Sequence, residues 1–264
     1  MEASLSPASF LCGGAAARLA RFFRLAYLGK SLNQERRCRV CCTVFTPAAS
    51  SENAILCPAC HAALPRREKG VCPLCGEAAA WPDLPVARCG RCMSTPPPWT
   101  NFICHGPHEG LLRTLLIRLK FGRQVHLGAV LGQLLARHPA LPALMPDCVT
   151  PVPLHTKRLV ERGYNQALLV AQPVANALQL PLDAHLLVRA KATVAQTASR
   201  REARLSNVRG AFTALPKAAG KHILLVDDTM TTGATLGEAA RCLMAAGASC
   251  ISVAVISRTP SCRK

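Results

Sequence analysis

Four pairs of cysteines, each separated by two residues, constrain the first part of this chain more than any other feature. They lie within 55 residues of one another and are Cys38/Cys41, Cys57/Cys60, Cys72/Cys75 and Cys89/Cys92. A C-x2-C turn places two thiolates on one side of a tetrahedron, and a second such turn completes a four-thiolate site. A site closed in this way leaves no coordination position for chemistry and is structural. We therefore expect two structural zinc ions, with an iron–sulfur centre as the less favoured alternative.

The spacing does not decide which pairs share a metal ion. Fifteen residues separate the first pair from the second, and thirteen separate the third from the fourth. Sequential pairing is the simplest arrangement, but an interleaved cross-brace is equally allowed. Long periodic apolar segments are scarce here and prolines are frequent, so metal replaces a hydrophobic core. We expect a small zinc-ribbon-like domain over residues 35–95.

Residues 1–34 precede this region and read as an N-terminal extension. Arg18, Arg21 and Arg24 interrupt its apolar stretch at helical spacing, and the core of an export signal tolerates no such charges. The same spacing is typical of a short basic amphipathic helix. The 15 cysteines are an odd number, which favours metal ligands in a reducing compartment over a disulfide framework. We therefore expect a cytoplasmic protein.

The chain carries a large positive charge. Its 32 lysines and arginines oppose 14 acidic residues, which gives a net charge of +18. Such a charge attracts anions, and nucleic acid, phosphorylated metabolites and acidic membrane surfaces all qualify. Half of the 264 residues are hydrophobic, so the chain can bury a substantial core. The apolar stretches are all broken by charges, and we expect no transmembrane helix.

The pattern changes after the proline-rich stretch 95–99, which reads as a stiff connector. Helix-like and strand-like segments alternate from there to the end. The predicted helices cover residues 110–120, 127–138, 165–178 and 235–246, and the predicted strands cover 148–154, 222–226 and 250–256. Short apolar strands separated by helices favour a parallel sheet with crossover helices. We therefore expect an α/β domain over residues 96–264.

The most informative segment of this domain is Ile223–Thr235, with the sequence ILLVDDTMTTGAT. A buried strand ends there at Asp227 and Asp228, and ligands of parallel sheets bind at the carboxyl ends of strands. The threonine hydroxyls, the loop amides and the start of the next helix suit a phosphate, and Gly233 lets the backbone approach it. The two carboxylates repel phosphate but accept hydrogen bonds from sugar hydroxyls. The segment therefore predicts a site for a ribose 5-phosphate group.

Two details refine this segment. Thr235 and Glu238 have the spacing of a capping box, which predicts that the helix starts at Thr235. No lysine follows Gly233, so the loop is not the triphosphate-binding loop whose motif requires one.

The segment Ile223–Thr235 resembles the phosphoribosyl pyrophosphate (PRPP) motif of type I phosphoribosyltransferases. A C-x2-C region followed by such a domain is similar to the ComF family, also called the GntX or DNA-utilisation family. The resemblance runs from about Cys38 to Arg258, and its other segments are Leu119–Gly122, Pro151–Leu154, Arg158, Arg162–Gln166 and Thr193–Phe212. It implies a type I phosphoribosyltransferase-like parallel sheet domain preceded by the small cysteine-rich domain.

The resemblance also assigns roles to residues. Asp227 and Asp228 would bind the ribose hydroxyls of PRPP. The rest of the predicted PRPP-binding set, which includes the ligands of the 5-phosphate, is Thr229, Thr231, Thr232, Gly233, Ala234 and Thr235. Arg158 and Arg162 lie where the family's pyrophosphate loop is expected, and guanidinium groups suit pyrophosphate oxygens. Mg2+ would arrive with the pyrophosphate rather than occupy a protein cage.

A strongly basic run over residues 188–210 matches the family's mobile hood over the substrate. Its characteristic residues include Gln196, Arg204 and Asn207, whereas Ser199 stands where the family usually has leucine. The same run is also compatible with binding nucleic-acid phosphates or with a solvated charged surface.

Two functions from different classes follow. The first is a PRPP-binding, phosphoribosyltransferase-like protein linked to DNA uptake or DNA utilisation. Its turnover stays open because no residue stands out as a general base. The alternative is a non-catalytic protein that binds single-stranded DNA or the DNA-uptake machinery and uses PRPP as an allosteric ligand. A third, weaker hypothesis treats the cysteine-rich region as a docking module for a partner protein.

Overall fold

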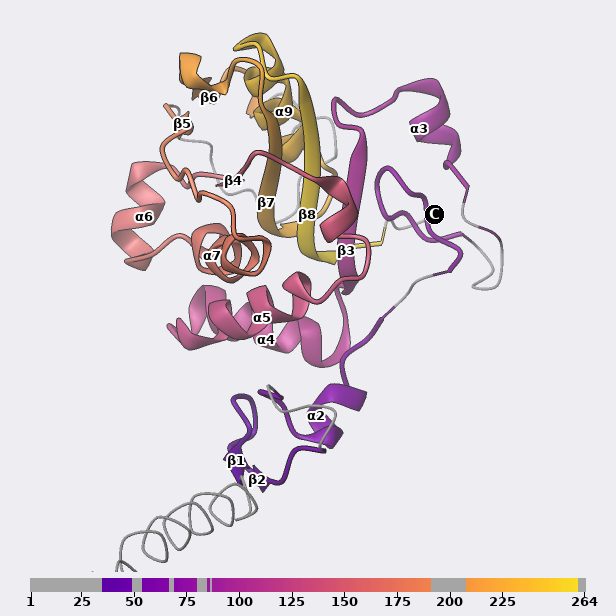
Figure 1. Ribbon diagram of the computed structural model, residues 1–264, viewed down its shortest axis with the longest axis vertical. Helices are drawn as coiled ribbons and strands as arrows, with labels where there is room; N and C mark the ends of the chain where they lie inside the picture. Colours follow the sequence, from indigo (N-terminus) through magenta and orange to yellow (C-terminus); the bar gives the residue numbers. More distant parts are fainter. Residues whose placement is uncertain are drawn as a thin grey trace, which may run out of the picture. The chain divides into compact units, whose positions relative to one another are not determined.

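The structure is a computed structural model that describes residues 35–48, 54–66, 69–79, 85, 87–190 and 208–260. The chain divides into two compact units, residues 1–57 and residues 58–264, and Figure 1 colours them along the sequence. The predicted division at residues 34 and 95 stays a prediction. The amphipathic helix expected before residue 35 lies outside the described residues.

The described part of the first unit is built around a short hairpin. Strand β1 (Arg36–Arg37) pairs antiparallel with β2 (Val44–Phe45). The turn between them is held by backbone hydrogen bonds from Cys38 N to Thr43 O at 2.9 Å and from Cys42 N to Cys38 O at 3.0 Å. This turn brings the first C-x2-C pair together.

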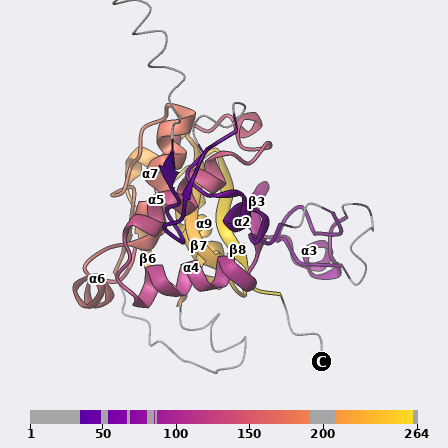
Figure 2. The same ribbon diagram turned by 90° about the horizontal axis from the view of Figure 1, so that it is seen from below.

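The second unit contains a four-stranded parallel sheet with the strand order β3-β8-β7-β4. The strands are β3 (Asn101–Pro107), β4 (Cys148–Pro151), β7 (His222–Met230) and β8 (Cys250–Arg258). Figure 2 shows β7 and β8 side by side, with β3 beyond β8. Because all four strands are parallel, their carboxyl ends meet at one edge of the sheet, where ligands of such folds bind.

Helices cover both faces of this sheet. They are α4 (Gly110–Phe121), α5 (His126–Ala136), α7 (Gln166–Leu178) and α9 (Ala234–Ala245). Helices α5 and α7 pack closely where α5 carries glycine. A Cβ atom on Gly128 would lie 2.4 Å from Leu169 Cβ, and one on Gly132 would lie 2.5 Å from Val170 O. Helix α7 runs through Pro173.

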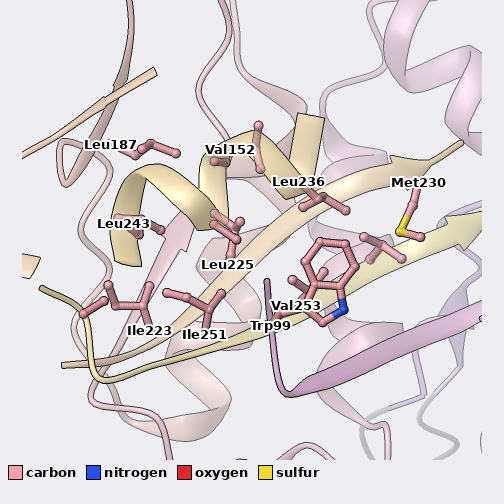
Figure 3. Packing of buried hydrophobic residues seen from close by; sticks show 14 of the residues in the cluster. Trp99, Val152, Leu187, Ile223, Leu225, Met230, Leu236, Leu243, Ile251 and Val253 are labelled. Carbon is pink, nitrogen blue, oxygen red and sulfur yellow. The ribbon is translucent and has the colours of Figure 1, made fainter. Parts of the chain in front are cut away.

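Helix α9 packs on a sheet face through a continuous apolar cluster. Figure 3 shows Trp99, Met230, Leu236 and Val253 within it. The cluster also contains three cysteines of the third and fourth C-x2-C pairs: Cys72, Cys75 and Cys92. Part of the cysteine-rich region is therefore built into the core of the second unit.

The remaining elements are short. They are α2 (Pro58–Ala62), α3 (Gly90–Ser94), α6 (Thr156–Arg162), the antiparallel pair β5 (Leu187–Arg189) and β6 (Phe212–Ala214), and 3-10 turns at Pro142–Leu144 and Pro216–Ala218. No helix in the described part of the chain is both long and apolar enough to cross a membrane.

The parallel α/β architecture predicted from the sequence is confirmed. All four predicted helices and all three predicted strands are present, with ends that differ by a few residues. The sequence analysis missed β3, α6 and the β5–β6 pair. Strand β7 is longer than predicted, because it continues through both aspartates to Met230.

Candidate functional site

The eight cysteines of the four C-x2-C pairs gather into two four-cysteine groups. The first group is Cys38, Cys41, Cys57 and Cys60, and the second is Cys72, Cys75, Cys89 and Cys92. Within each group the sulfur atoms all lie within 4.8 Å of one another. The structure thus contains the sequential pairing that the spacing left open.

The sulfur geometry fits zinc. With zinc–sulfur bonds of about 2.3 Å, neighbouring sulfurs of a tetrahedral site lie about 3.8 Å apart. The Sγ atoms of Cys41 and Cys57 are 3.6 Å apart, as are those of Cys75 and Cys89. Four thiolates leave no open coordination position, so both groups are compatible with structural zinc.

Two contacts tie the second four-cysteine group to the sheet. The indole Nε1 of Trp99 donates a hydrogen bond to Leu74 O at 2.7 Å, inside the third C-x2-C turn. Arg258, the last residue of β8, donates from Nε to Cys75 O at 3.0 Å and from Nη2 to Glu77 at 2.7 Å. Arg258 is only 3% exposed. This buried guanidinium therefore joins the metal turn to the carboxyl edge of the sheet.

The two predicted sugar ligands lie at that same edge, within β7. Asp228 is mostly buried, and its Oδ2 forms an ion pair with Lys120 Nζ at 3.0 Å. The Lys120 ammonium also donates to Thr229 Oγ1 at 3.1 Å. Lys120 comes from the end of α4, so two distant segments meet at the predicted ribose site.

Asp227 has an unusual acidity. Burial, together with the negative charge of Asp228, raises the pKa of Asp227 to about 7. One of its oxygens accepts a hydrogen bond from the Asp228 amide at 2.8 Å. A carboxyl group poised near neutral pH can both accept and donate hydrogen bonds, as recognition of sugar hydroxyls requires.

The loop after β7 has the backbone that a phosphate site needs. Gly233 adopts φ +81°, a left-handed conformation that favours glycine, and caps the start of α9. Thr232 Oγ1 accepts a hydrogen bond from the Ala234 amide at 3.3 Å. Among the described residues, no hydrogen bond engages the hydroxyls of Thr231 and Thr235. Those hydroxyls, and the amides that follow Ala234 in the first turn of α9, are therefore available to an anion.

The predicted capping box is wrong. Helix α9 begins at Ala234, one residue before Thr235. The Glu238 carboxylate does not turn back to the helix start, because it accepts hydrogen bonds from the Gly210 amide at 2.6 Å and from Arg241 at 2.8 Å. Glu238 instead ties the segment before β6 to α9.

The two predicted pyrophosphate ligands, Arg158 and Arg162, both lie on α6. The guanidinium of Arg162 lies over the ring of Phe121, at 5.5 Å from the ring centroid. Phe121 is the residue that follows Lys120. Tyr164 adds a hydrogen bond from its hydroxyl to Leu119 O. These contacts hold the loop after β4 against the end of α4.

Arg158 belongs to a wider set of charges that includes Arg189, which the sequence analysis placed in the basic run over residues 188–210. Burial lowers the pKa of Arg189, the positive charge of Arg158 lowers it further, and Asp227 opposes both. Arg189 also lies over the Phe212 ring at 5.3 Å. The structure therefore brings a second arginine toward the predicted sugar site. The predicted hood residues Gln196, Arg204 and Asn207 lie outside the described residues.

A polar chain extends the edge beyond β7. Thr229 Oγ1 accepts a hydrogen bond from Ser257 Oγ at 3.3 Å, and Ser257 Oγ is 2.9 Å from His108 Nδ1. Burial and the charge of Lys120 lower the pKa of His108. Sequence analysis missed His108 and Ser257, which carry no motif signal. Lys120 was visible only as part of the Leu119–Gly122 segment.

Comparison with known proteins agrees with this geometry. The family model described as "Phosphoribosyl transferase domain" matches residues 165–264. The DNA utilization protein YhgH of Salmonella typhimurium is 34% identical over 209 residues, which cover 77% of this chain and 90% of that protein. The chain belongs to the ComF/GntX family.

More distant members of the family extend the match. Competence protein F of Haemophilus influenzae is 31% identical over 196 residues, with 70% of this chain and 85% of that protein covered. Competence protein ComFC of Bacillus subtilis is 30% identical over 206 residues, with 73% and 79% covered. This ComF/GntX protein therefore combines a phosphoribosyltransferase-type sheet domain with two four-cysteine groups.

Proposed function

We propose that this cytoplasmic protein binds PRPP at the carboxyl edge of its parallel sheet. The observation that carries the proposal is the juxtaposition of two mostly buried carboxyl groups, Asp227 and Asp228, with the left-handed turn at Gly233. Carboxylates suit the ribose hydroxyls, and the turn with its free hydroxyls suits the 5-phosphate. A ribose 5-phosphate is a ligand that carries both of these groups.

The cations near this edge support a pyrophosphate group on the ribose C1. Lys120 at the end of α4 pairs with Asp228, and the charges of Asp227 and of Arg158 on α6 both act on Arg189. Guanidinium groups bind phosphate oxygens in pairs, and Mg2+ would be bound mainly by the pyrophosphate. In a transfer reaction, a nucleophilic acceptor would bond to C1 as the C1–O bond to pyrophosphate breaks, and these cations would stabilise the charge that develops on the leaving group.

Calorimetry with the zinc-containing full chain, PRPP and Mg2+ tests the proposal. We expect saturable binding, and we expect Asp228→Asn to weaken it roughly 30-fold because a hydrogen bond to a charged group is lost. Asp183→Asn is the matched control, since it also removes a carboxylate that pairs with a lysine, Lys217, outside the site. Absence of binding by the unaltered protein, or equal loss in both variants, would contradict the proposal.

A second function, binding of single-stranded DNA, is favoured by a different observation. The net charge is +18, and the relatives carry names that refer to DNA utilization and competence. Phosphate contacts of lysine and arginine make affinity fall steeply with salt. We propose this activity as a property of the basic surface, with PRPP as a separate ligand.

The two functions separate in one titration series. DNA binding through the basic surface predicts a linear fall of log affinity with log salt and no change with Asp228→Asn. PRPP binding predicts the reverse: the affinity falls in Asp228→Asn and depends less on salt. An affinity for an oligonucleotide that does not depend on salt would exclude the second function.

A further inference from the structure

A cavity of about 680 Å3 lies beside the phosphate loop, within the second unit, and shares only the residues of that loop with the proposed PRPP site. Its walls come from α3 of the second four-cysteine group, from the Pro96–Trp99 connector and from the start of α9. The volume is within the range of natural small-molecule sites. Because Thr232, Gly233 and Ala234 also line it, the cavity continues directly from the loop that would hold the 5-phosphate.

One wall is apolar and held in place. It consists of the three prolines of residues 96–98, here called the proline wall, and of the edge of the Trp99 indole, which is only 7% exposed and packs in the apolar cluster. The hydrogen bond from Trp99 Nε1 to Leu74 O fixes the ring, and a Cβ atom on Gly233 would lie 3.7 Å from Trp99 Cη2. The indole edge therefore borders the phosphate loop. The accessible prolines give this wall an apolar surface that suits the apolar face of a heterocycle.

The opposite wall is cationic. Arg91 and Arg241 line the cavity, and no aspartate or glutamate is among its described lining residues. The Arg241 guanidinium lies along α9, where a Cβ atom on Gly237 would be 3.6 Å from its Nη1. Glu238 Oε2 holds Arg241 through Nε and Nη2 at 3.3 Å and 2.8 Å, which leaves Nη1 to face a ligand. A guanidinium held in this way suits a second phosphate group.

We propose that this cavity binds the nucleoside monophosphate part of a ligand whose ribose 5-phosphate occupies the PRPP site. The ligand class is a ribose linked through its 5-phosphate to a nucleoside phosphate. The first phosphate lies in the loop Thr232–Ala234, the second faces Arg241, and the base lies against the proline wall. The inference rests on the proposed ribose 5-phosphate site and extends it on the far side of the phosphate.

Two soluble probes test the cavity separately from the loop. ADP-ribose carries the complete ligand chemistry, whereas ribose 5-phosphate carries only the part bound by the edge. In calorimetry with the zinc-containing full chain, we expect ADP-ribose to bind about tenfold more tightly or better, since it adds a charge-assisted contact and the packing of a base on the proline wall.

A cavity-filling variant provides the decisive comparison. Gly237→Leu introduces a side chain into the cavity at a helical position whose Cβ would meet only the end of Arg241, and leucine favours a helix more than glycine does. We expect this variant to remove the tenfold advantage of ADP-ribose and to keep the affinity for ribose 5-phosphate within about twofold. Ala245→Leu adds the same side chain at an exposed position of α9 and should change neither affinity.

The outcomes distinguish the two proposals. If ribose 5-phosphate binds and ADP-ribose binds no better, or if its advantage survives in Gly237→Leu, the cavity is not a nucleotide site and the PRPP proposal stands. If neither probe nor PRPP binds, the PRPP proposal is wrong and the cavity proposal is overturned with it. Thermal unfolding of both leucine variants checks that α9 remains intact.

Discussion

The two four-cysteine groups have nearly the same sequence pattern but very different surroundings. The first is built on the β1–β2 hairpin, and its Cys41 is exposed and bonds to the Thr43 hydroxyl. Cys72, Cys75 and Cys92 of the second group are buried in the same cluster as Met230 and Leu236. Identical metal chemistry thus serves a local turn in one case and a large hydrophobic core in the other.

This difference shows that the contribution of a structural metal site to the stability of a fold depends on what packs on it. In both groups a zinc ion would replace side-chain core that a short segment cannot supply. In the second group the metal turn also carries Leu74 O and Cys75 O, which accept hydrogen bonds from Trp99 and Arg258. Loss of that metal should therefore reach the ligand edge of the sheet.

The largest effect should come from removing one ligand of each group in turn. We expect Cys75→Ser to destabilise the sheet domain by roughly 4 kcal/mol or more, because loss of a metal is among the strongest single-site effects. Cys41→Ser should leave that transition unchanged. Denaturant unfolding followed by Trp99 fluorescence, in a Trp81→Phe background, measures both. Equal destabilisation by the two variants would show that the two four-cysteine groups do not differ in their importance for the sheet domain.

A smaller effect is expected when the tie between β8 and the second group is cut. Arg258→Met removes the guanidinium that donates to the Glu77 carboxylate and to Cys75 O. Breaking a buried ion pair from one side costs about 3 kcal/mol. Denaturant unfolding measures this loss. Arg113→Met, at an exposed position of α4, is the control and should cost little.

Zinc release should sharpen the comparison kinetically. Because Cys41 is exposed whereas no cysteine of the second group is, a colorimetric chelator should remove the two zinc ions in two phases whose rates differ by about a hundredfold. The fast phase should vanish in Cys41→Ser. Added PRPP should slow only the slow phase, since a ligand stabilises the part that binds it. A single phase, or retardation of the fast one, would argue against the assignment.

The smallest effect concerns pH at the edge beside the second group. The pKa of Asp227 is raised to about 7, so its carboxylate forms only as pH passes that value. If the ionised form accepts the sugar hydroxyls, affinity for ribose 5-phosphate should rise about tenfold from pH 6 to pH 8. Asp227→Asn should remove this rise and leave only the titration of the ligand phosphate, as calorimetry can measure.

The raised pKa of Asp227 has the opposite effect on folding stability: ligand affinity rises with pH, whereas stability falls. The folded protein holds the Asp227 proton more tightly than the unfolded chain, so this group's contribution to stability is greatest at low pH. It is lost as pH rises from about 4 through 7. A stability contribution from Asp227 that increased over this range would contradict the raised pKa.

Local patterns predicted the fold class well and the edges of its elements less well. The parallel sheet followed from apolar strands separated by helices. Strand β3 was missed because its sequence NFICHGP mixes polar residues with glycine and proline. Strand β7 was predicted too short, since two aspartates read as the end of a strand, whereas pairing with β8 carries it to Met230.

For the site, the sequence predicted the motif residues but not their long-range partners. Lys120 lies 109 positions before Thr229, and no local pattern announces that contact. The capping-box prediction failed for a similar reason, because Glu238 bonds to the Gly210 amide 28 positions away. Sequence spacing also could not choose a cysteine pairing, since both arrangements satisfy four thiolates around zinc.

The contact between Arg258 and Cys75 joins residues 183 positions apart. During synthesis, the cysteines of the second group leave the ribosome long before β8 does, so zinc can bind while its anchor is still unmade. A chain truncated before β8 would keep the contact of this metal turn with Trp99 but would lack the Arg258 anchor. The order of synthesis thus leaves the zinc-binding turn half anchored until β8 has been made.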